Sequence, residues 1–186
     1  MDIAFYLDNL DSFIFFFFNK TLANPFFDKF MPFITESKHW LIFYFLVLFY
    51  LLIKGGTKGR VAVIMALVLV FCTDQSSNIL KELFMRIRPC HTLPNVNLLV
   101  GCTESYSFPS NHAMNNFAAA VLFSHFYPKM KVWLFTVATI VAMSRVFVGV
   151  HYLSDIIGGA IAGTLIALGL LYIWKLINNK FKILKA

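Results

Sequence analysis

The stretch Ser144-Arg-Val-Phe-Val-Gly-Val-His-Tyr-Leu-Ser-Asp155 lies where one apolar segment ends and the next begins. His151 and Asp155 are four residues apart in it, so on a helix they would share a face. A carboxylate one turn from a histidine can hold one ring nitrogen and leave the other free to react. Arg145 adds a planar donor fork that suits phosphate or carboxylate. Taken alone, the stretch is equally compatible with a juxtamembrane turn that carries ordinary polar residues.

The composition surrounding this stretch is that of a membrane protein. Of 186 residues, 59% are hydrophobic and 13% are charged, whereas a soluble domain has about 45–50% apolar and about 25% charged residues. We therefore predict one membrane-embedded domain over residues 1–186. The net charge of +7 does not indicate nucleic-acid binding, because the basic residues lie at the ends of apolar segments. The N-terminal stretch is acidic before its first lysine, so no cleaved signal peptide is expected.

Five apolar segments approach the roughly 20 residues that a helix needs to cross a bilayer. They lie at residues 40–53, 61–85, 109–127, 132–149 and 153–175. Residues 1–38 are Phe-rich but are interrupted by acidic residues and prolines, which favours an amphipathic interfacial helix followed by a broken hairpin. A sixth span is the alternative for that region. The predicted fold class is all-α, a polytopic transmembrane helix bundle whose catalytic part is residues 40–175.

The basic residues predict how the bundle is oriented. They fall in alternate connections and in the tail, at Lys54, Lys58, Arg60, Lys129, Lys131, Lys175, Lys180, Lys182 and Lys185. The positive-inside rule makes that side cytoplasmic. The extracytoplasmic side then receives the 86–108 loop and the turn at 149–155, where most of the unusual polar residues lie. We therefore expect a multi-pass protein of a bacterial cytoplasmic membrane with its site facing outward.

A second polar stretch, Lys81-Glu-Leu-Phe-Met-Arg-Ile-Arg88-Pro89, ends the second apolar segment. Lys81 and Arg88 are two helical turns apart, so both could face one cavity if the helix continues. Cations at the C-terminal end of a helix also suit its dipole or reach toward the membrane surface, which is the alternative explanation.

A third stretch, Pro109-Ser110-Asn111-His112, begins the third apolar segment. The N-terminus of a helix presents unpaired N–H groups and a positive dipole end, which bind anions. Ser110 would add a hydroxyl, and Asn111 tolerates the positive φ that an anion-binding nest can require. The alternative is a simple N-cap at Ser110 with His112 at the membrane interface.

The predicted topology brings these three stretches to one leaflet. A helix N-terminus, three cations and two histidines together form a site for a multiply charged oxyanion, built from Lys81, Arg88, Ser110, His112, Arg145, His151 and Asp155. Phosphoryl transfer requires positioning and charge stabilisation more than elaborate covalent chemistry. The site is therefore suited to that reaction.

The motifs Lys-x6-Arg-Pro, Pro-Ser-x-His and Ser-Arg-x5-His-x3-Asp, in this order, resemble the three-part signature of the type 2 phosphatidic acid phosphatase superfamily. The resemblance runs from Lys81 to Asp155. It implies an integral membrane lipid phosphatase with a helical core similar to that of vanadium haloperoxidases. Small bacterial members act on lipid A 1-phosphate, undecaprenyl pyrophosphate or phosphatidylglycerophosphate.

The resemblance also implies roles for individual residues. His151 would be the nucleophile that forms a phosphohistidine, Asp155 its orienting carboxylate, and His112 the general acid. The phosphoryl oxygens would be held by Lys81, Arg88, Ser110, Arg145 and the backbone at Asn111. Because one histidine must be neutral and the other protonated, a bell-shaped pH–rate profile is expected.

Asn111 departs from the family pattern, which usually has glycine there. It is expected to add a side chain beside the phosphate, which would add a hydrogen bond or narrow the substrate range. Deeper in the same bundle, Asp74 is expected to play a structural role by pairing with a cation or a neighbouring helix.

The extracytoplasmic loop is bracketed by Cys90 and Cys102, and we predict a disulfide between them in an oxidising compartment. No metal or other cofactor is expected, because the outer side offers few carboxylates for a two-metal phosphatase. A zinc site formed by His91, His112 and His151 remains the alternative.

The function predicted from the sequence is a metal-independent lipid phosphatase at the extracytoplasmic membrane surface. Its partners would be the bilayer and a lipid phosphate substrate, with no nucleic acid, and the oligomeric state is left open. One alternative is a lipid phosphotransferase of the same family. An anion transporter is another, but the charges lie toward one leaflet and no internal repeat is visible.

Overall fold

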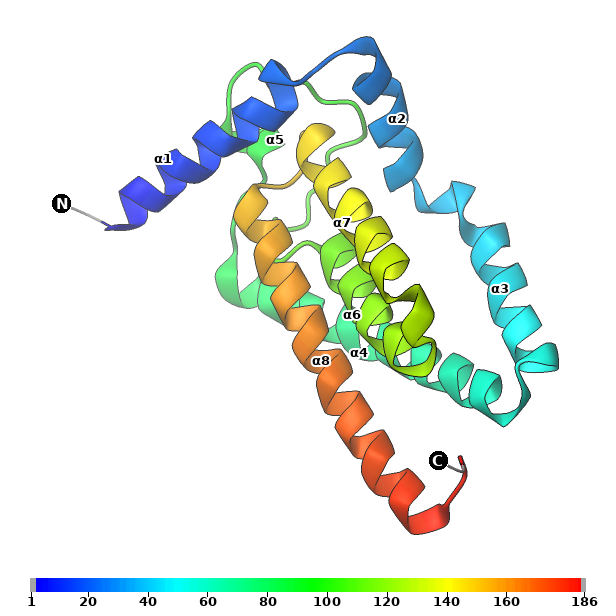
Figure 1. Cartoon of the computed structure of the whole chain (residues 1–186). Coiled ribbons are helices and arrows are strands. Elements are labelled where there is room, and N and C mark those ends of the chain that lie inside the picture. Colours follow the sequence, from blue (N-terminus) through cyan, green and yellow to red (C-terminus); the bar gives the residue numbers. More distant parts are fainter. Residues whose placement is uncertain (1–2, 185–186) are drawn as a thin grey trace.

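The computed structural model describes residues 3–184, and no residue in that range belongs to a β-strand (Figure 1). Within this range there are eight α-helices, most of them joined by short turns, with a longer loop at residues 93–110. They are α1 (Ile3–Phe16), α2 (Pro25–Thr35), α3 (Leu41–Lys54), α4 (Gly56–Phe84), α5 (Pro89–Thr92), α6 (Asn111–Phe126), α7 (Lys131–Phe147) and α8 (Leu153–Phe181). A π-helical turn η1 (Phe17–Thr21) follows α1, and 3₁₀ turns η2 (Ser37–His39) and η3 (Pro128–Met130) precede α3 and α7. The prediction of an all-α chain is confirmed.

Helix α6 lies at the centre of the bundle and packs against α8, α7 and α4. Gly163 allows α8 to approach α6 closely, because a Cβ atom there would overlap the carbonyl oxygen of Met114. The close approach brings the beginnings of both helices together, and the Ser110 N–H donates to the carbonyl oxygen of Asp155 over 3.1 Å. The two motifs that begin these helices are thereby placed side by side.

Three buried clusters are distributed along the bundle. One, around Leu69, Leu122 and Phe126, fills the space between α4, α6 and α8. A second joins α2 to the end of α7 through Met31 and Phe147. The third lies next to the site and includes Phe15 from α1 and Tyr152 from the turn before α8. Because Phe15 is fully buried there, α1 is anchored to the end of the bundle that carries the predicted site.

Large apolar side chains cover the outside of the bundle. They include Ile42 on α3, Phe71 on α4, Trp133 on α7 and Leu165 on α8, all more than half exposed. A soluble monomer rarely exposes continuous apolar surface of this kind, whereas a bilayer solvates it. The chain is a helical membrane protein.

The five predicted apolar segments all correspond to helices, but they differ in length. Among the described residues 3–184, three segments are long and apolar enough to cross a membrane: Gly56–Thr92, Pro128–Phe147 and Leu153–Phe181. Helix α3 has 14 residues and α6 has 16, which at the usual rise gives about 21 and 24 Å, against about 30 Å of hydrocarbon. That all five segments cross the membrane therefore stays a prediction.

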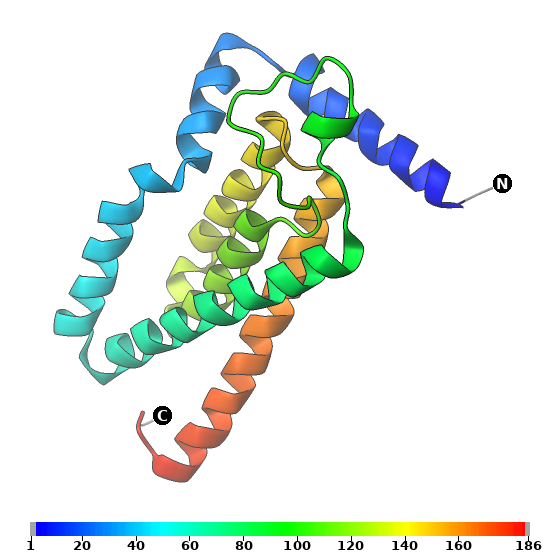
Figure 2. The ribbon, with the colours of Figure 1, turned by 180° about the vertical axis from the view of Figure 1, so that it is seen from behind.

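The two ends of the bundle differ in content. The α3–α4 turn, the α6–α7 turn and the C-terminal end of α8 lie together at the lower end in Figure 1. The end of α4, the beginnings of α6 and α8 and the 93–110 loop lie at the opposite end, with α1 and α2 beside them (Figures 1 and 2). The basic connections and the predicted site are thus at opposite ends.

Candidate active site

Lys81 and Arg88 reach the site from a helix and from the irregular segment after it, rather than from one continued helix. Helix α4 ends at Phe84, and Met85 adopts a left-handed conformation with φ 44°. Arg88 is extended, with ψ 151°. The Lys81 ammonium donates to the Tyr106 carbonyl oxygen, and Arg88 Nε donates to the Ser105 carbonyl oxygen over 2.7 Å. The two cations meet as predicted, but the helical periodicity was the wrong reason.

His151 lies in the turn between α7 and α8 with both ring nitrogens engaged. Its Nδ1 is 3.2 Å from Asp155 Oδ2, and its Nε2 is 3.1 Å from Arg88 Nη1. A guanidinium can only donate, so Nε2 accepts and the ring proton lies on Nδ1. Burial lowers the pKa of His151 to about 3, although Asp155 acts in the opposite direction. The ring is therefore neutral, with its Nε2 lone pair on the side of the cations.

Asp155 is completely buried, and both of its carboxylate oxygens accept hydrogen bonds. Oδ2 accepts from the Ser107 hydroxyl and, over 2.9 Å, from the Tyr152 N–H, in addition to the His151 ring. Oδ1 accepts from Arg86 Nη1 over 2.8 Å. Neither Ser107 nor Arg86 was predicted as a site residue, although Arg86 lies inside the quoted Lys81–Pro89 stretch.

Two buried donors in the site have no hydrogen-bond partner within the described part of the chain: the Ser110 hydroxyl and Arg145 Nε. Ser110 precedes α6, but its side chain does not cap the helix, so the alternative of a simple N-cap is wrong. Leaving a buried donor unpaired costs about 1–3 kcal/mol. Both donors suit a phosphoryl oxygen bound beside them.

His112 and Arg145 share a partner that the sequence did not indicate. His112 Nε2 is 3.2 Å from the Thr35 carbonyl oxygen, and Arg145 Nη1 donates to the Thr35 hydroxyl over 2.7 Å. Thr35 is buried at the end of α2. No motif marks this residue, because its role depends on how α2 packs against α7.

Asn111 differs from what the sequence suggested. It is the first residue of α6, and the non-glycine residues with positive φ within 3–184 are Met85, Asn95 and Lys182. The expectation of a left-handed nest is therefore wrong. The side-chain oxygen of Asn111 accepts from the Ser77 hydroxyl of α4 and so joins two helices, whereas a side chain beside the phosphate stays a prediction.

Asp74 accepts a hydrogen bond from Asn115 Nδ2 over 2.9 Å. Asp74 lies on α4 and Asn115 on α6, so this pair also joins two neighbouring helices. The structural role predicted for Asp74 is confirmed.

The loop beside the site contains the predicted disulfide between Cys90 and Cys102. Arg88 lies just before this closed loop and its partner Ser105 lies just after it. His91 is exposed and contacts the Thr103 carbonyl oxygen at 3.2 Å, so it is a rim residue. Within residues 3–184, one cluster has three possible metal ligands, formed by the two bonded cysteines and His91. The alternative zinc site of three histidines is not formed.

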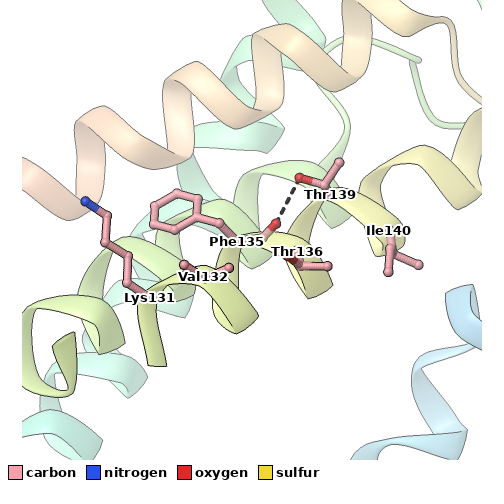
Figure 3. Close-up of a pocket in the computed structure, with 6 residues that line it drawn as sticks. All are labelled: Lys131, Val132, Phe135, Thr136, Thr139 and Ile140. Carbon is pink, nitrogen blue, oxygen red and sulfur yellow. Dashed lines mark hydrogen bonds between the residues drawn. The ribbon is translucent and has the colours of Figure 1, made fainter. Parts of the chain in front are cut away.

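A hollow of about 510 Å³ lies elsewhere, on the outer side of α7 (Figure 3). Lys131, Val132 and Phe135 line one end, and Thr139 donates to the Phe135 carbonyl oxygen over 2.8 Å. Since this hydroxyl is already bonded within its own helix, the hollow offers little beyond apolar surface. It contains none of the predicted site residues.

The geometry can be compared with known proteins. A family model described as the PAP2 superfamily matches residues 58–179. The chain belongs to this superfamily. All eight predicted site residues lie within the matched range, whereas Thr35 lies outside it.

Two relatives and one solved structure illustrate the similarity. A lipid A 4'-phosphatase of Porphyromonas gingivalis is 31% identical over 78% of this chain and 65% of its own. A bacitracin transport permease protein, BcrC, of Bacillus licheniformis is 35% identical over 73% of this chain and 66% of its own. The chain thus spans just under two thirds of the length of these relatives.

The solved structure is a transmembrane PAP2-type phosphatidylglycerolphosphate phosphatase of Bacillus subtilis. It superimposes with a TM-score of 0.74 at 24% identity, over 92% of this chain and 88% of that one. The likeness shows that the two proteins share a fold.

Proposed function

We propose that the chain, as a single domain over residues 1–186, is a metal-independent lipid phosphatase that works through a phosphohistidine. The observation that carries the proposal is the state of His151. Asp155 holds the Nδ1 proton, and the Nε2 lone pair lies beside Arg88. A neutral histidine held in this tautomer is a competent nucleophile.

In the first step, His151 Nε2 attacks phosphorus. A P–N bond forms while the P–O bond to the lipid breaks, and His112 gives a proton to the departing oxygen. Arg88 would exchange its contact with Nε2 for one with a phosphoryl oxygen. Lys81, Ser110, Arg145 and the N–H of Asn111 would hold the remaining oxygens and stabilise the charge that develops there.

In the second step, a water molecule attacks the phosphohistidine. His112, now neutral, accepts a proton from this water, the P–N bond breaks and inorganic phosphate leaves. The step restores protonated His112 and neutral His151. The two steps together consume one water and release one alcohol or lipid monophosphate, so neither needs a metal or an oxidant.

The proposed substrate is a lipid phosphate or pyrophosphate of the cell envelope: lipid A 1-phosphate, undecaprenyl pyrophosphate or phosphatidylglycerophosphate. The names of the relatives support lipids of this kind. The location of the site at the end opposite the basic connections supports an extracytoplasmic reaction at a bacterial cytoplasmic membrane.

Transport of an anion is the competing class, because one relative is named as a transport permease. The geometry favours chemistry over transport. A completely buried carboxylate that fixes one tautomer of a histidine serves a nucleophile, whereas an anion binding site has no need of it.

The test is phosphate release by the purified protein in detergent with chelator present, against a panel of the three lipids. His151→Ala is compared with a matched variant, His125→Ala, whose ring is exposed at the far end of α6. We expect release by the wild type and by His125→Ala, and none by His151→Ala. Activity that survives in His151→Ala, or silence across the panel from folded protein, would contradict the proposal. Turnover only after addition of an acceptor lipid would indicate a phosphotransferase.

A further inference from the structure

Arg86 connects the catalytic carboxylate to the N-terminal helix. Its Nη1 donates to Asp155 Oδ1 over 2.8 Å, and its Nη2 donates to Asp11 Oδ2 over 2.7 Å. The guanidinium also lies over the ring of Tyr152, 4.1 Å from its centroid. One cation is therefore held between two carboxylates and an aromatic face.

The two carboxylate oxygens of Asp155 accept hydrogen bonds from different groups. Oδ2 serves His151, Ser107 and the Tyr152 N–H, whereas Oδ1 is given to Arg86. A carboxylate held at both oxygens cannot rotate about its last bond. Because the plane of the carboxylate is fixed, the direction from which Oδ2 accepts the hydrogen bond of His151 Nδ1 is fixed as well.

Helix α1 supplies the far side of this connection. Asp11 also accepts from the Ser154 N–H over 3.1 Å and from the Ser154 hydroxyl, at the first turn of α8. Phe15, one turn further along α1, packs its ring 5.8 Å from that of Tyr152. These contacts come from a part of the chain outside the family match, so they are additional to the three motifs.

Binding of a second substrate phosphate by Arg86 is the competing explanation. Arg86 lines a groove of about 530 Å³ together with Asp8, Asp11 and Ser154, and about a quarter of its side chain is exposed. Three carboxylates surround this one cation, however: Asp8 at 3.7 Å, Asp11 and Asp155. A phosphate there would meet net negative charge, which disfavours its binding.

We propose that Arg86, held by Asp11 of α1, is a positioning residue that fixes Asp155 and through it the reactive tautomer of His151. The inference rests on the proposed function, since it assigns a role within the same reaction. Arg86 does not touch the substrate, so its loss affects the chemical step and leaves phosphate binding unchanged. The placement of α1 against α8 thereby becomes part of the catalytic apparatus.

The kinetic test compares Arg86→Gln, Arg86→Lys and Asp11→Asn with Arg60→Gln. Arg60 is the matched control, because it is exposed at the opposite end of α4 and contacts the Leu52 carbonyl oxygen. In metal sites, loss of a group that orients a ligand costs about tenfold to hundredfold, and by analogy we expect a fall of that size in kcat for Arg86→Gln. Arg86→Lys should recover part of it, and Asp11→Asn should lose less.

The binding readouts separate positioning from substrate contact. For Arg86→Gln, KM and the inhibition constant of inorganic phosphate should stay within about twofold of the wild type. A large rise in either constant with kcat unchanged would overturn the proposal in favour of a substrate contact. Equal kcat in Arg86→Gln and Arg60→Gln would overturn it as well.

A second measurement does not depend on activity. The pKa of His151 is followed by NMR of ¹⁵N-histidine-labelled protein in detergent, with the signal assigned from the His151→Ala spectrum. The charged or polar groups that face this ring come from several elements, and they are Asp155, Arg88, Arg145 and Ser107. Without the positive charge of Arg86, the negative charge of Asp155 is less compensated and favours a protonated His151 more strongly. The pKa of His151 should therefore rise by about 1.

The two measurements keep the inference distinct from the proposed function. If the wild type releases no phosphate from any lipid, the proposed function fails while the His151 titration still decides the positioning role. An unchanged titration in Arg86→Gln would refute the role of Arg86, whatever the activity. A thermal melt of each variant verifies that it is folded.

Discussion

The two histidines of the site are held in opposite ways. His151 is enclosed by charged partners on both ring nitrogens, Asp155 on one side and Arg88 on the other. Within residues 3–184 the ring of His112 makes one hydrogen bond, to the neutral carbonyl oxygen of Thr35. Asp155 and Arg88 lie within the residues that the family model matches, whereas Thr35, the partner of His112, lies on α2 outside them.

This difference corresponds to the two roles proposed. A nucleophile must present one tautomer at every turnover, and a fixed carboxylate achieves that. An acid that later acts as a base must gain and lose a proton, and a strong ion pair on its ring would oppose one of the two states. A single neutral carbonyl oxygen orients the His112 ring and forms no ion pair with it.

The largest effect is expected when Asp155, one of the two charged partners of His151, is replaced. In Asp155→Asn the amide can donate to Nδ1, which would move the ring proton to Nε2 and block attack. A loss of about 10⁴-fold in kcat is expected by analogy with catalytic triads. Steady-state kinetics and a thermal melt check it, with Asp28→Asn on α2 as the control. Retention of more than a tenth of the activity would show that the tautomer is set by another group.

The second expectation distinguishes the acid from the nucleophile. His112→Asn should lower kcat on a lipid phosphate by roughly 10³-fold, within the range of general acid catalysis. An aryl phosphate such as p-nitrophenyl phosphate has a leaving group that needs no protonation, so its first step, followed as the burst of p-nitrophenol, should be far less affected. The second step, in which His112 acts as a base, should be slowed with both substrates. For His151→Ala the loss should be complete with both substrates. An equal loss in the first step for His112→Asn on both substrates would remove the role of general acid.

Stability at acidic pH provides the third comparison. The pKa of His151 is lowered from 6.5 to about 3 by burial, so between these values the unfolded chain binds a proton that the folded chain does not. The free energy of unfolding therefore falls as the pH falls below about 6.5, by on the order of 2 kcal/mol near pH 5. Melting temperatures in detergent should decline less between pH 7 and 5 for His151→Gln than for the wild type. Parallel declines would show that His151 is not buried as a neutral ring.

Whether a contact could be predicted from the sequence depends on how far apart in the chain its two residues lie. The helices were predictable from apolar runs, and His151 with Asp155 from a spacing of four residues. The meeting of the three motifs followed from topology and from the resemblance. Asn111 was misjudged because its tolerance of positive φ says nothing about whether the backbone uses it, and here Ser77 engages its side chain instead.

The contacts from the N-terminal region could not be predicted in this way. Asp11 lies 75 residues before Arg86, and Thr35 lies 110 residues before Arg145. No local period or motif relates positions so far apart, since their meeting depends on how α1 and α2 pack on the bundle. An acidic residue within an apolar helix, as at Asp11, was the one available signal, and it was attributed to the interface.

The smallest effect is expected at Thr35, where one contact can be removed and the other kept. Thr35→Val keeps the shape and the backbone carbonyl that holds His112, but it removes the hydroxyl that orients the Arg145 guanidinium. A hydrogen bond of this kind contributes about 1 kcal/mol. The inhibition constant of inorganic phosphate should therefore rise about fivefold, with kcat nearly unchanged.

Thr139→Val is the matched control for Thr35→Val, because the Thr139 hydroxyl is bonded within α7 and lies away from the site. Tighter phosphate binding in Thr35→Val would show that the hydroxyl competes with phosphate for Arg145 rather than orienting it. A fall in kcat comparable to that of His112→Asn would show that the side chain, and not the carbonyl, holds the acid. Either outcome would remove the distinction between a rigidly enclosed nucleophile and a lightly held acid.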